Sequence, residues 1–302
     1  MRIGFIGLGV MGTPMALRLA LKFQLIVWNR SISKYPLLVE AGAEVADTPA
    51  EVVEKSDVVF TMLFDEPSLR SILDKDGFKA ALRGKTLVNT SSVSVDFSRY
   101  LAGQAQEAGG SFVEMPVSGS KVPAEQGQLV GMLAGDPNMV DRIKPIVEPM
   151  TRAAVYCGPI GMGLMTKYAV NTYSITMTVG LAESMSLAQA QGLDIDAFGQ
   201  VLNAGPMASP YSKLKIAKMI NGDWSSQASI KDCYNSARLI KEAGTAADTR
   251  MPLISICESL YGEAMQLGLA GEDMIAVAKV VGGQCRPGYL GRDTAPSEDE
   301  RD

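Results

Sequence analysis

The chain opens with Met1-Arg2-Ile3-Gly4-Phe5-Ile6-Gly7-Leu8-Gly9-Val10-Met11-Gly12. The apolar residues 3–6 predict a short buried strand, and residues 14–20 predict the helix that follows it. The three glycines after the strand have the spacing G-x-G-x-x-G, in which the first permits a tight turn, the second lets the backbone approach a pyrophosphate and the third lets helix and strand pack closely. The segment therefore predicts a dinucleotide-binding fold whose phosphates lie against residues 7–12.

The next apolar run, residues 24–28, predicts the second strand of the same unit. In this fold an acidic residue about 20 positions past the glycines selects NAD by binding the ribose hydroxyls. Here that place holds Asn29, followed by Arg30 and Ser31. An arginine and a hydroxyl would bind a 2′-phosphate that an acid would repel. A solvated polar turn is the alternative interpretation, but after the glycine motif we expect NADP(H) at Asn29, Arg30 and Ser31.

Composition excludes several classes of protein. The chain has 302 residues, enough for two domains, and a net charge of −5 that gives no support for a nucleic-acid surface. No apolar stretch reaches the length of a membrane span, and the N-terminal apolar run is a strand rather than a signal peptide. The four cysteines have no metal-binding spacing (Cys157, Cys233, Cys257 and Cys285). We therefore expect a cytoplasmic protein without a metal site.

The chain contains no histidine. This excludes a Ser-His-Asp or Cys-His site, a histidine-ligated zinc ion and a histidine general acid. Any proton chemistry must use lysine, tyrosine, cysteine or a carboxylate.

The pattern along the chain changes near residue 162. Before it, short buried strands alternate with helices, which predicts an α/β fold with a Rossmann-type doubly wound sheet. After it, one long interdomain helix is predicted from Leu164 to about Gln191, and the remaining pattern to residue 281 is helical. We expect a Rossmann domain over 1–162, a helical substrate and oligomerisation domain over 163–282, and a disordered tail over 283–302. Five large side chains are expected in the core of the long helix (Met165, Tyr168, Tyr173, Met177 and Met185).

Several motifs together resemble the β-hydroxyacid dehydrogenase family, over roughly residues 1 to 281. The glycine loop is similar to the family's cofactor signature. Residues 114–121, Glu-Met-Pro-Val-Ser-Gly-Ser-Lys, resemble its substrate segment D-x-P-V-S-G-[GS]. Residues 161–171, Gly-Met-Gly-Leu-Met-Thr-Lys-Tyr-Ala-Val-Asn, resemble its catalytic segment G-x-G-x-x-x-K-x-x-x-N. Lys231-Asp232 resembles its C-terminal lysine–aspartate pair, with Trp224 at the usual place of a phenylalanine.

Three positions depart from the family pattern: Glu114 replaces the usual aspartate, Val170 a frequent asparagine, and Gln227 a second lysine. These changes leave the reaction type intact and put the substrate in doubt. Residues 118–125 resemble the glyoxylate/succinic semialdehyde reductase branch more than the hydroxyisobutyrate branch.

The resemblance implies that Lys167 and Asn171 are the catalytic residues. They are four positions apart on a predicted helix and so share one face. A lysine there can protonate an alkoxide as a hydride arrives, whereas the reverse role as a base would need a pKa below the ordinary value of about 10.4. A surface lysine beside an inward asparagine is the alternative, but the preceding Gly-x-Gly and the domain boundary favour a functional pair.

The same resemblance and the sheet topology suggest the binding residues. Ser118, Gly119 and Ser120 follow a strand, so their hydroxyl and N–H groups should meet a small carboxylate at the carboxyl edge of the sheet. The resemblance alone gives Lys231 a place at the cofactor and substrate, and gives Ser92 and its neighbour Ser91 a place near the nicotinamide. Three alternatives stay open: an ordinary polar loop at 118–120, a solvated Lys231, and a core role for Met62 and Leu63 in place of cofactor packing.

The sequence thus predicts an NADPH-dependent reductase of a small carboxylate-bearing aldehyde or keto acid, with Lys167 as proton donor. A close alternative is an NAD(P)-dependent 3-hydroxyisobutyrate or other β-hydroxyacid dehydrogenase. The alternative from another class is a non-catalytic NADPH-binding protein, which would be expected to lose the lysine. The long apolar helix predicts a homodimer or homotetramer. We expect no nucleic-acid or membrane partner.

Overall fold

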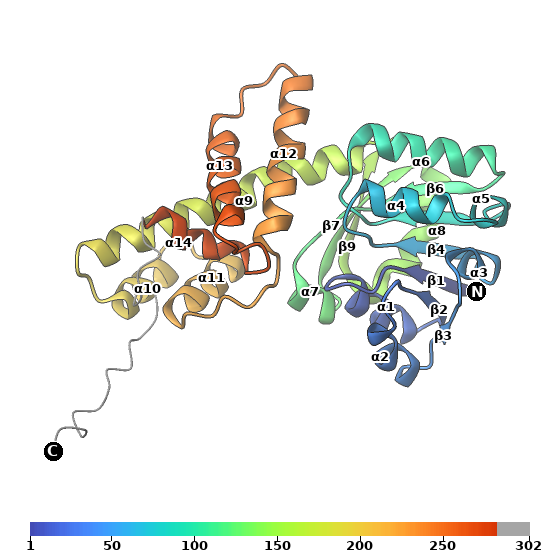
Figure 1. The fold of residues 1–302 in the computed structure, drawn as a ribbon, viewed down its shortest axis with the longest axis horizontal. Coiled ribbons are helices and arrows are strands. Elements are labelled where there is room, and N and C mark those ends of the chain that lie inside the picture. Colours follow the sequence, from blue (N-terminus) through green and yellow to red (C-terminus); the bar gives the residue numbers. More distant parts are fainter. Residues whose placement is uncertain (283–302) are drawn as a thin grey trace. The chain divides into compact units, whose positions relative to one another are not determined.

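The computed structural model describes residues 1–282. The described chain divides into two compact units, with the boundary between Val170 and Asn171. The first unit contains the β-sheet and its covering helices, and the second is helical (Figure 1). This confirms the predicted fold class, a doubly wound sheet followed by a helical region. The tail predicted to be disordered, 283–302, lies outside the described residues.

One nine-stranded sheet forms the centre of the first unit, as far as the described residues go. Its strands are β1 (Arg2–Ile6), β2 (Gln24–Trp28), β3 (Glu44–Val45), β4 (Val58–Thr61), β5 (Thr86–Asn89), β6 (Ser111–Glu114), β7 (Val117–Ser118), β8 (Leu129–Gly135) and β9 (Thr151–Gly158). The strand order is β3-β2-β1-β4-β5-β6-β8-β7, and β9 pairs with β8. All pairings are parallel except those of β8 with β6 and β7. The short β3 and the antiparallel return through β7 and β8 were not predicted.

The strand order reverses at β1, which lies between β2 and β4. In the register of the sheet, Ile6 is the partner of Trp28 on one side and of Thr61 on the other. The carboxyl ends of β1 and β4 are therefore neighbours at the switch point, which is where open α/β sheets bind their ligands.

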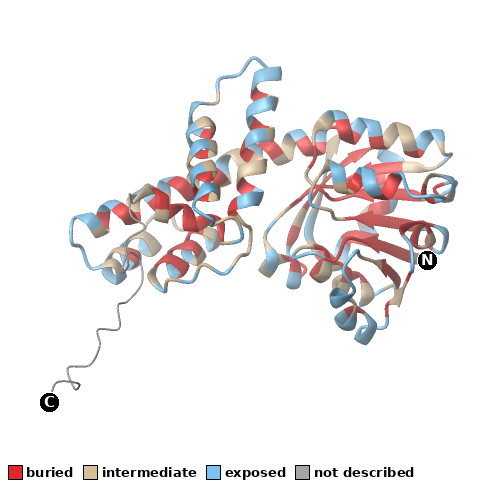
Figure 2. Cartoon of the chain, viewed as in Figure 1, coloured by how far each residue is buried: buried red, intermediate tan, exposed pale blue. Residues whose placement is uncertain are grey.

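Helices bury both faces of this sheet. They are α1 (Gly12–Ala20), η1 (Ile32–Lys34), α2 (Tyr35–Glu40), α3 (Pro49–Glu54), α4 (Glu66–Leu73), α5 (Phe78–Ala81), α6 (Val95–Glu107), α7 (Lys121–Glu125), α8 (Pro137–Val147) and η2 (Glu148–Met150). Phe5 of β1 belongs to a buried cluster with Met15 of α1 and Ile143 of α8. The preceding position of β1, Gly4, faces α3, because a Cβ there would lie 2.6 Å from Val52 Cγ1. The central strands β1, β4 and β5 are accordingly buried on both sides, as parallel sheets require, whereas β9 at the edge is largely exposed (Figure 2).

The long helix predicted from residue 164 is α9 (Met162–Ala190), which starts in the first unit and continues in the second. Tyr168 and Met185 are buried in its core, as expected. Met165 and Tyr173 are instead 41% and 70% exposed, so the expectation for them was wrong. Because this helix carries apolar residues around its whole circumference, its pattern does not indicate which of them face solvent.

The second unit adds further helices to α9: α10 (Ile195–Ala204), α11 (Pro210–Ile220), α12 (Ile230–Ala246), α13 (Pro252–Gln266), η3 (Met274–Val277) and α14 (Ala278–Val281). Its centre contains a buried ion pair, in which Lys215 Nζ lies 2.5 Å from Asp273 Oδ1. The second carboxylate oxygen of Asp273 accepts a hydrogen bond from the Gln227 amide at 3.0 Å. Asp273 thereby fixes the loop before α12. Over residues 1–282, we find no helix that combines the length and the apolar character of a membrane span.

Candidate active site

The glycine loop connects β1 to α1, and two of its glycines are required by their surroundings. Gly7 has a φ of +100°, and a Cβ on it would lie 2.3 Å from the Met62 carbonyl oxygen. A Cβ on Gly12 would lie 1.9 Å from the Gly7 carbonyl oxygen. Either side chain would displace the backbone. Between them Gly9 is exposed, and a Cβ there would meet nothing within 4 Å.

The open space beside Gly9 adjoins the N-terminus of α1. The N-cap residue Met11 makes no side-chain hydrogen bond, whereas Asp65 and Ser94 cap α4 and α6 with their side chains. Uncapped N–H groups at the start of a helix suit a phosphate, and a glycine facing open space lets the phosphate come close. The residues present therefore fit a dinucleotide pyrophosphate. The loop residues Leu8 and Val10 differ in burial, Leu8 being buried and Val10 exposed.

The structure brings Met62 and Leu63 against the glycine loop. The Met62 amide donates to the Ile6 carbonyl at 2.9 Å, and Leu63 Cδ2 lies 2.8 Å from where a Gly7 Cβ would stand. Leu63 is held in turn by Ser91 Oγ, which accepts its amide hydrogen at 2.8 Å. Both residues are half-buried at the switch point. The sequence predicted Ser91 and Ser92 near the nicotinamide but not this hydrogen bond of Ser91. Ser92 is half-buried beyond the end of β5.

The turn after β2 is bound to the glycine loop through Asn29. Asn29 Oδ1 accepts the Leu8 amide hydrogen at 2.9 Å, and Asn29 Nδ2 donates to the Ser31 carbonyl at 3.0 Å. The Tyr35 hydroxyl accepts from the Asn29 amide at 3.0 Å and donates to the Asn29 carbonyl at 2.8 Å. These bonds fix the turn, while the side chains of Arg30 and Ser31 are exposed on it. Tyr35 carried no signal that marked it for this role.

The predicted substrate segment, residues 118–120, lies at the end of β7 and leads into α7, before the antiparallel strand β8. Ser118 is the last residue of β7 and pairs with Val130 of β8. Gly119 follows with a φ of +124°, and a Cβ on it would lie 2.7 Å from Leu129 Cδ2. Ser120 is the N-cap of α7, without a side-chain cap bond. The two serines are half-buried and the glycine is exposed, so all three remain accessible to a small ligand.

The carboxylate of Glu114 is buried at the end of β6 and binds the start of α9. It accepts hydrogen bonds from Ser98 Oγ at 2.5 Å, from the Gly161 amide at 3.1 Å and from the Leu164 amide at 2.7 Å. Burial raises the pKa of Glu114 above its ordinary value, and these hydrogen bonds oppose the rise. The sequence marked Glu114 only as a departure from the family pattern.

Lys167 stands in the second turn of α9 and is half-buried. The next residue, Tyr168, is buried, and its hydroxyl donates to the Val93 carbonyl at 2.5 Å. The loop from β5 to α6 therefore fixes the turn that carries Lys167. Lys167 thus lies on a helix that follows β9, whereas the glycine loop follows β1 and residues 119–120 follow β7.

Asn171 and Lys231 belong to the second unit. Asn171 is half-buried on α9, and its Nδ2 lies 3.5 Å from Ser236 Oγ of α12. Lys231 is exposed in the first turn of α12, and its amide donates to the Ala270 carbonyl at 3.2 Å. Its neighbour Asp232 completes a capping box with Ser229, whose Oγ accepts the Asp232 amide hydrogen at 3.1 Å. Asp232 of the lysine–aspartate pair thus has a structural role as part of a helix cap, which was not predicted from the sequence.

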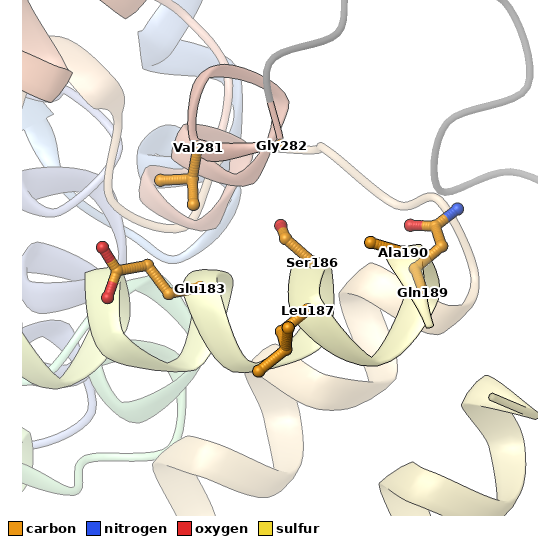
Figure 3. Close-up of a pocket in the computed structure, with 7 residues that line it drawn as sticks. All are labelled: Glu183, Ser186, Leu187, Gln189, Ala190, Val281 and Gly282. Carbon is orange, nitrogen blue, oxygen red and sulfur yellow. The ribbon is translucent and has the colours of Figure 1, made fainter. Parts of the chain in front are cut away.

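A separate cavity of 560 Å³ lies in the second unit (Figure 3). It is lined by Glu183, Ser186, Leu187, Gln189 and Ala190 of α9, together with Val281 and Gly282. Ser186 Oγ and Gln189 Oε1 are buried and have no hydrogen-bond partner within residues 1–282. None of the predicted site residues lines this cavity.

Two protein-family models match the chain. Residues 2–158 match the NAD binding domain of 6-phosphogluconate dehydrogenase. Residues 161–281 match the NAD-binding region of NADP-dependent 3-hydroxyisobutyrate dehydrogenase.

Individual relatives agree with the family models. Glyoxylate/succinic semialdehyde reductase 1 of Arabidopsis thaliana is 34% identical over 284 residues, which cover 93% of this chain and 98% of that protein. The chloroplastic reductase 2 of the same plant is also 34% identical, over 92% of this chain and 79% of that protein. The structure of 3-hydroxyisobutyrate dehydrogenase from Salmonella typhimurium has the same fold, with a TM-score of 0.86 at 22% identity over 93% of this chain and 99% of that chain.

An open glycine loop at the switch point of a parallel sheet, together with these matches, defines a nicotinamide-dinucleotide oxidoreductase. The chain belongs to the β-hydroxyacid dehydrogenase family, whose members are NAD(P)-dependent enzymes that act on CH–OH groups. The predicted resemblance to the glyoxylate/succinic semialdehyde reductase branch is confirmed by the two plant relatives.

Proposed function

We propose that this protein is an NADPH-dependent reductase of a small carboxylate-bearing aldehyde or keto acid, of the glyoxylate and succinic semialdehyde type. The surroundings of Lys167 carry the proposal. This lysine is half-buried in a helical turn that is held by the Tyr168 hydroxyl and begins at the buried Glu114 carboxylate. A non-catalytic relative would be expected to lose this lysine, whereas this chain keeps it together with Asn171.

The proposed chemistry is a carbonyl reduction. Bound NADPH would supply a hydride to the carbonyl carbon. The ammonium group of Lys167 gives its proton to the carbonyl oxygen, which becomes the hydroxyl of the product. An ordinary lysine side chain is protonated at neutral pH, so this direction needs no prior change of its charge. Asn171, four residues further along α9, orients the lysine or the reacting oxygen through its amide.

The same proposal assigns the binding residues. The hydroxyl and N–H groups of Ser118, Gly119 and Ser120 hold the substrate carboxylate, and Lys231 adds positive charge to it and to the cofactor. The glycine loop holds the pyrophosphate. Ser92, Met62 and Leu63 line the cofactor's place beyond the loop.

The preference for NADPH rests on the turn after β2. Asn29 uses its side chain to hold the glycine loop, and no acid stands there to repel a phosphate. The exposed side chains of Arg30 and Ser31 are available to bind the 2′-phosphate by charge-assisted hydrogen bonds.

The test begins with fluorescence titration of the protein with NADPH and NADH. NADPH oxidation is then followed with glyoxylate, succinic semialdehyde and methylmalonate semialdehyde, for the natural protein and for Lys167→Met. We expect tight NADPH binding, turnover of at least one aldehyde acid, and a loss of about 10²- to 10⁴-fold in kcat for the variant with NADPH binding retained. Lys144→Met, on α8 and in an ion pair with Asp141, is the matched control and should keep its activity.

Other outcomes would change the conclusion. Full turnover by Lys167→Met would refute the proposed proton donor. NADP⁺ or NAD⁺ reduction with 3-hydroxyisobutyrate or serine, without aldehyde reduction, would assign the protein to the hydroxyacid-oxidising branch. NADPH binding without turnover of any of these compounds would favour a binding protein.

We further infer a homodimer or homotetramer built on the helical region, residues 163–282. Large apolar side chains are exposed on it, among them Leu187 at 60%, Val201 at 67% and Met207 at 85%. Light scattering behind a sizing column would measure the assembly. We also infer a cytoplasmic location, because the four cysteines show neither a CxxC pair nor a metal-binding spacing in the sequence.

A further inference from the structure

Glu114 combines a charged side chain with complete burial. Its exposed fraction is 0%, and no cation forms an ion pair with it in the part of the chain that the structure describes. Its donors are instead one hydroxyl, from Ser98, and backbone amides at the start of α9. The first N–H groups of a helix lack partners within the helix and carry partial positive charge. The start of α9 therefore offsets part of the cost of burying this carboxylate.

The two glycines before Lys167 make this contact possible. A Cβ on Gly163 would lie 2.8 Å from Glu114 Oε1 and 2.7 Å from the Met132 carbonyl oxygen. Gly161 has a φ of +100°, and a Cβ on it would lie 2.9 Å from Val95 Cγ1. Gly163 thus lets the Glu114 carboxylate and strand β8 come close to α9, and Gly161 supplies the positive-φ turn beside α6 that precedes the helix.

Lys167 follows Gly163 by four residues, so it lies on the same face of α9, one turn further along. Its neighbour Tyr168 is bound to the Val93 carbonyl. The backbone that carries Lys167 is therefore fixed on one side by Glu114 and on the other by Tyr168. A shift or rotation of the first turn would move the lysine, and a displacement of about 1 Å at a reacting group can cost about 100-fold in rate.

The geometry points to Glu114 as a positioning residue for Lys167: its carboxylate sets where α9 begins and thereby where the proton donor stands. This inference rests on the proposed function, in which Lys167 donates the proton. It also accounts for the departure from the family pattern. The glutamate side chain, one methylene longer than aspartate, reaches Ser98 on α6 as well as the amides of α9.

The experiment replaces the carboxylate by an amide of the same shape, Glu114→Gln. One carboxylate oxygen is then replaced by an NH₂ group facing other donors, so the first turn of α9 loses part of its cap. We expect kcat to fall about 10- to 100-fold, while KM and the Kd for NADPH stay within about threefold of the natural values. Glu114→Asp keeps the charge with a shorter reach and should give an intermediate kcat.

The matched control is Asp136→Asn. Asp136 is a carboxylate that caps α8 by accepting the Asn138 and Met139 amide hydrogens, and α8 carries no predicted site residue. This variant should lower the melting temperature and leave kcat within about twofold, because losing a helix cap costs stability only. If Glu114→Gln does not fold, Ser98→Ala removes a single hydrogen bond to the carboxylate and should reduce kcat about three- to tenfold.

A double-variant cycle separates this inference from the proposed function. If Glu114 acts through Lys167, adding Glu114→Gln to Lys167→Met should not lower the residual turnover further. Additive losses, or a Glu114→Gln variant with natural kcat beside an inactive Lys167→Met, would overturn the positioning role alone. An active Lys167→Met variant would overturn the proposed function first and this inference with it.

Discussion

The backbone amide of Leu8 donates a hydrogen bond of 2.9 Å to the side-chain oxygen of Asn29. This bond joins the loop that fits a pyrophosphate to the turn that would meet the adenosine ribose. Because Asn29 is occupied in this way, we expect its two exposed neighbours, Arg30 and Ser31, to discriminate between the cofactors at the 2′ position.

Replacing Arg30 by alanine should separate the two cofactors. We expect the Kd for NADPH to rise by about tenfold or more, since a charge-assisted hydrogen bond contributes about 1.5–3 kcal/mol, and the Kd for NADH to change little. Fluorescence titration with both cofactors measures this, with Arg152→Ala on the exposed strand β9 as the control. Equal weakening of both cofactors would show that Arg30 does not read the 2′-phosphate.

Gly9→Ala and Gly12→Ala should behave differently. A methyl group on Gly9 meets nothing within 4 Å, so the variant should keep its melting temperature and lose about tenfold or more in affinity for both cofactors. A methyl group on Gly12 would collide with the Gly7 carbonyl, so that variant should unfold at a much lower temperature. Gly103→Ala, in open space on α6, should gain up to about 1 kcal/mol and bind normally. Normal NADPH binding by Gly9→Ala would contradict the predicted cradle.

The stability of the protein should depend on pH through Glu114. Burial raises its pKa above the ordinary value of 4.5 in the folded chain. The folded state then binds the proton more tightly than the unfolded state, so this contribution favours folding below about pH 4.5 and is lost as the pH rises through the folded pKa. The glutamine of Glu114→Gln does not titrate. Relative to this variant, the natural protein should therefore lose stability as the pH rises from 4 to the folded pKa of Glu114. Urea unfolding of both proteins from pH 4 to 8 measures their free energies of unfolding. If the natural protein instead gained stability relative to Glu114→Gln as the pH rises, the pKa of Glu114 would be lowered in the folded chain.

The ion pair between Lys215 and Asp273 should be costly to break. Lys215→Met leaves a buried carboxylate without its cation, and such a loss costs about 3–5 kcal/mol of unfolding free energy. Lys144→Met breaks an exposed pair and should cost about 1 kcal/mol or less. Urea unfolding of both variants gives the comparison, and similar losses would show that water reaches the buried pair.

Local patterns in the sequence predicted the features that depend on near neighbours. The glycine loop lies between a strand and a helix that immediately flank it, and the lysine and asparagine of α9 need only helical spacing. Glu114 could not be recognised in this way, because its partners Gly161 and Leu164 are 47 and 50 positions away. The hydrogen bonds of Ser91 to the Leu63 amide and of Tyr35 to the Asn29 backbone were not predicted either, because each joins a side chain to a backbone group of another segment.

The core of the long helix was only partly predictable. Tyr168 and Met185 are buried as expected, whereas Met165 and Tyr173 are exposed. In a helix that is apolar on all sides, the sequence pattern does not distinguish buried from exposed positions, because burial depends on the elements packed around the helix. The roles of the predicted site residues remain predictions, to be tested by the variants above.

The anchoring of α9 also has a consequence for the order of assembly during folding. The contacts that hold its first turns, from Glu114 to Leu164 and from Val93 to Tyr168, each close a chain segment of 50 or 75 residues. Closing such long segments lowers the conformational entropy of the chain before the contact contributes any stabilising free energy, so these contacts form slowly. We infer that α9 can coil early through its own backbone bonds, while its starting point is fixed only after β5 and β6 have joined the sheet. The residue proposed for proton transfer would then be among the last in the first unit to reach its final position.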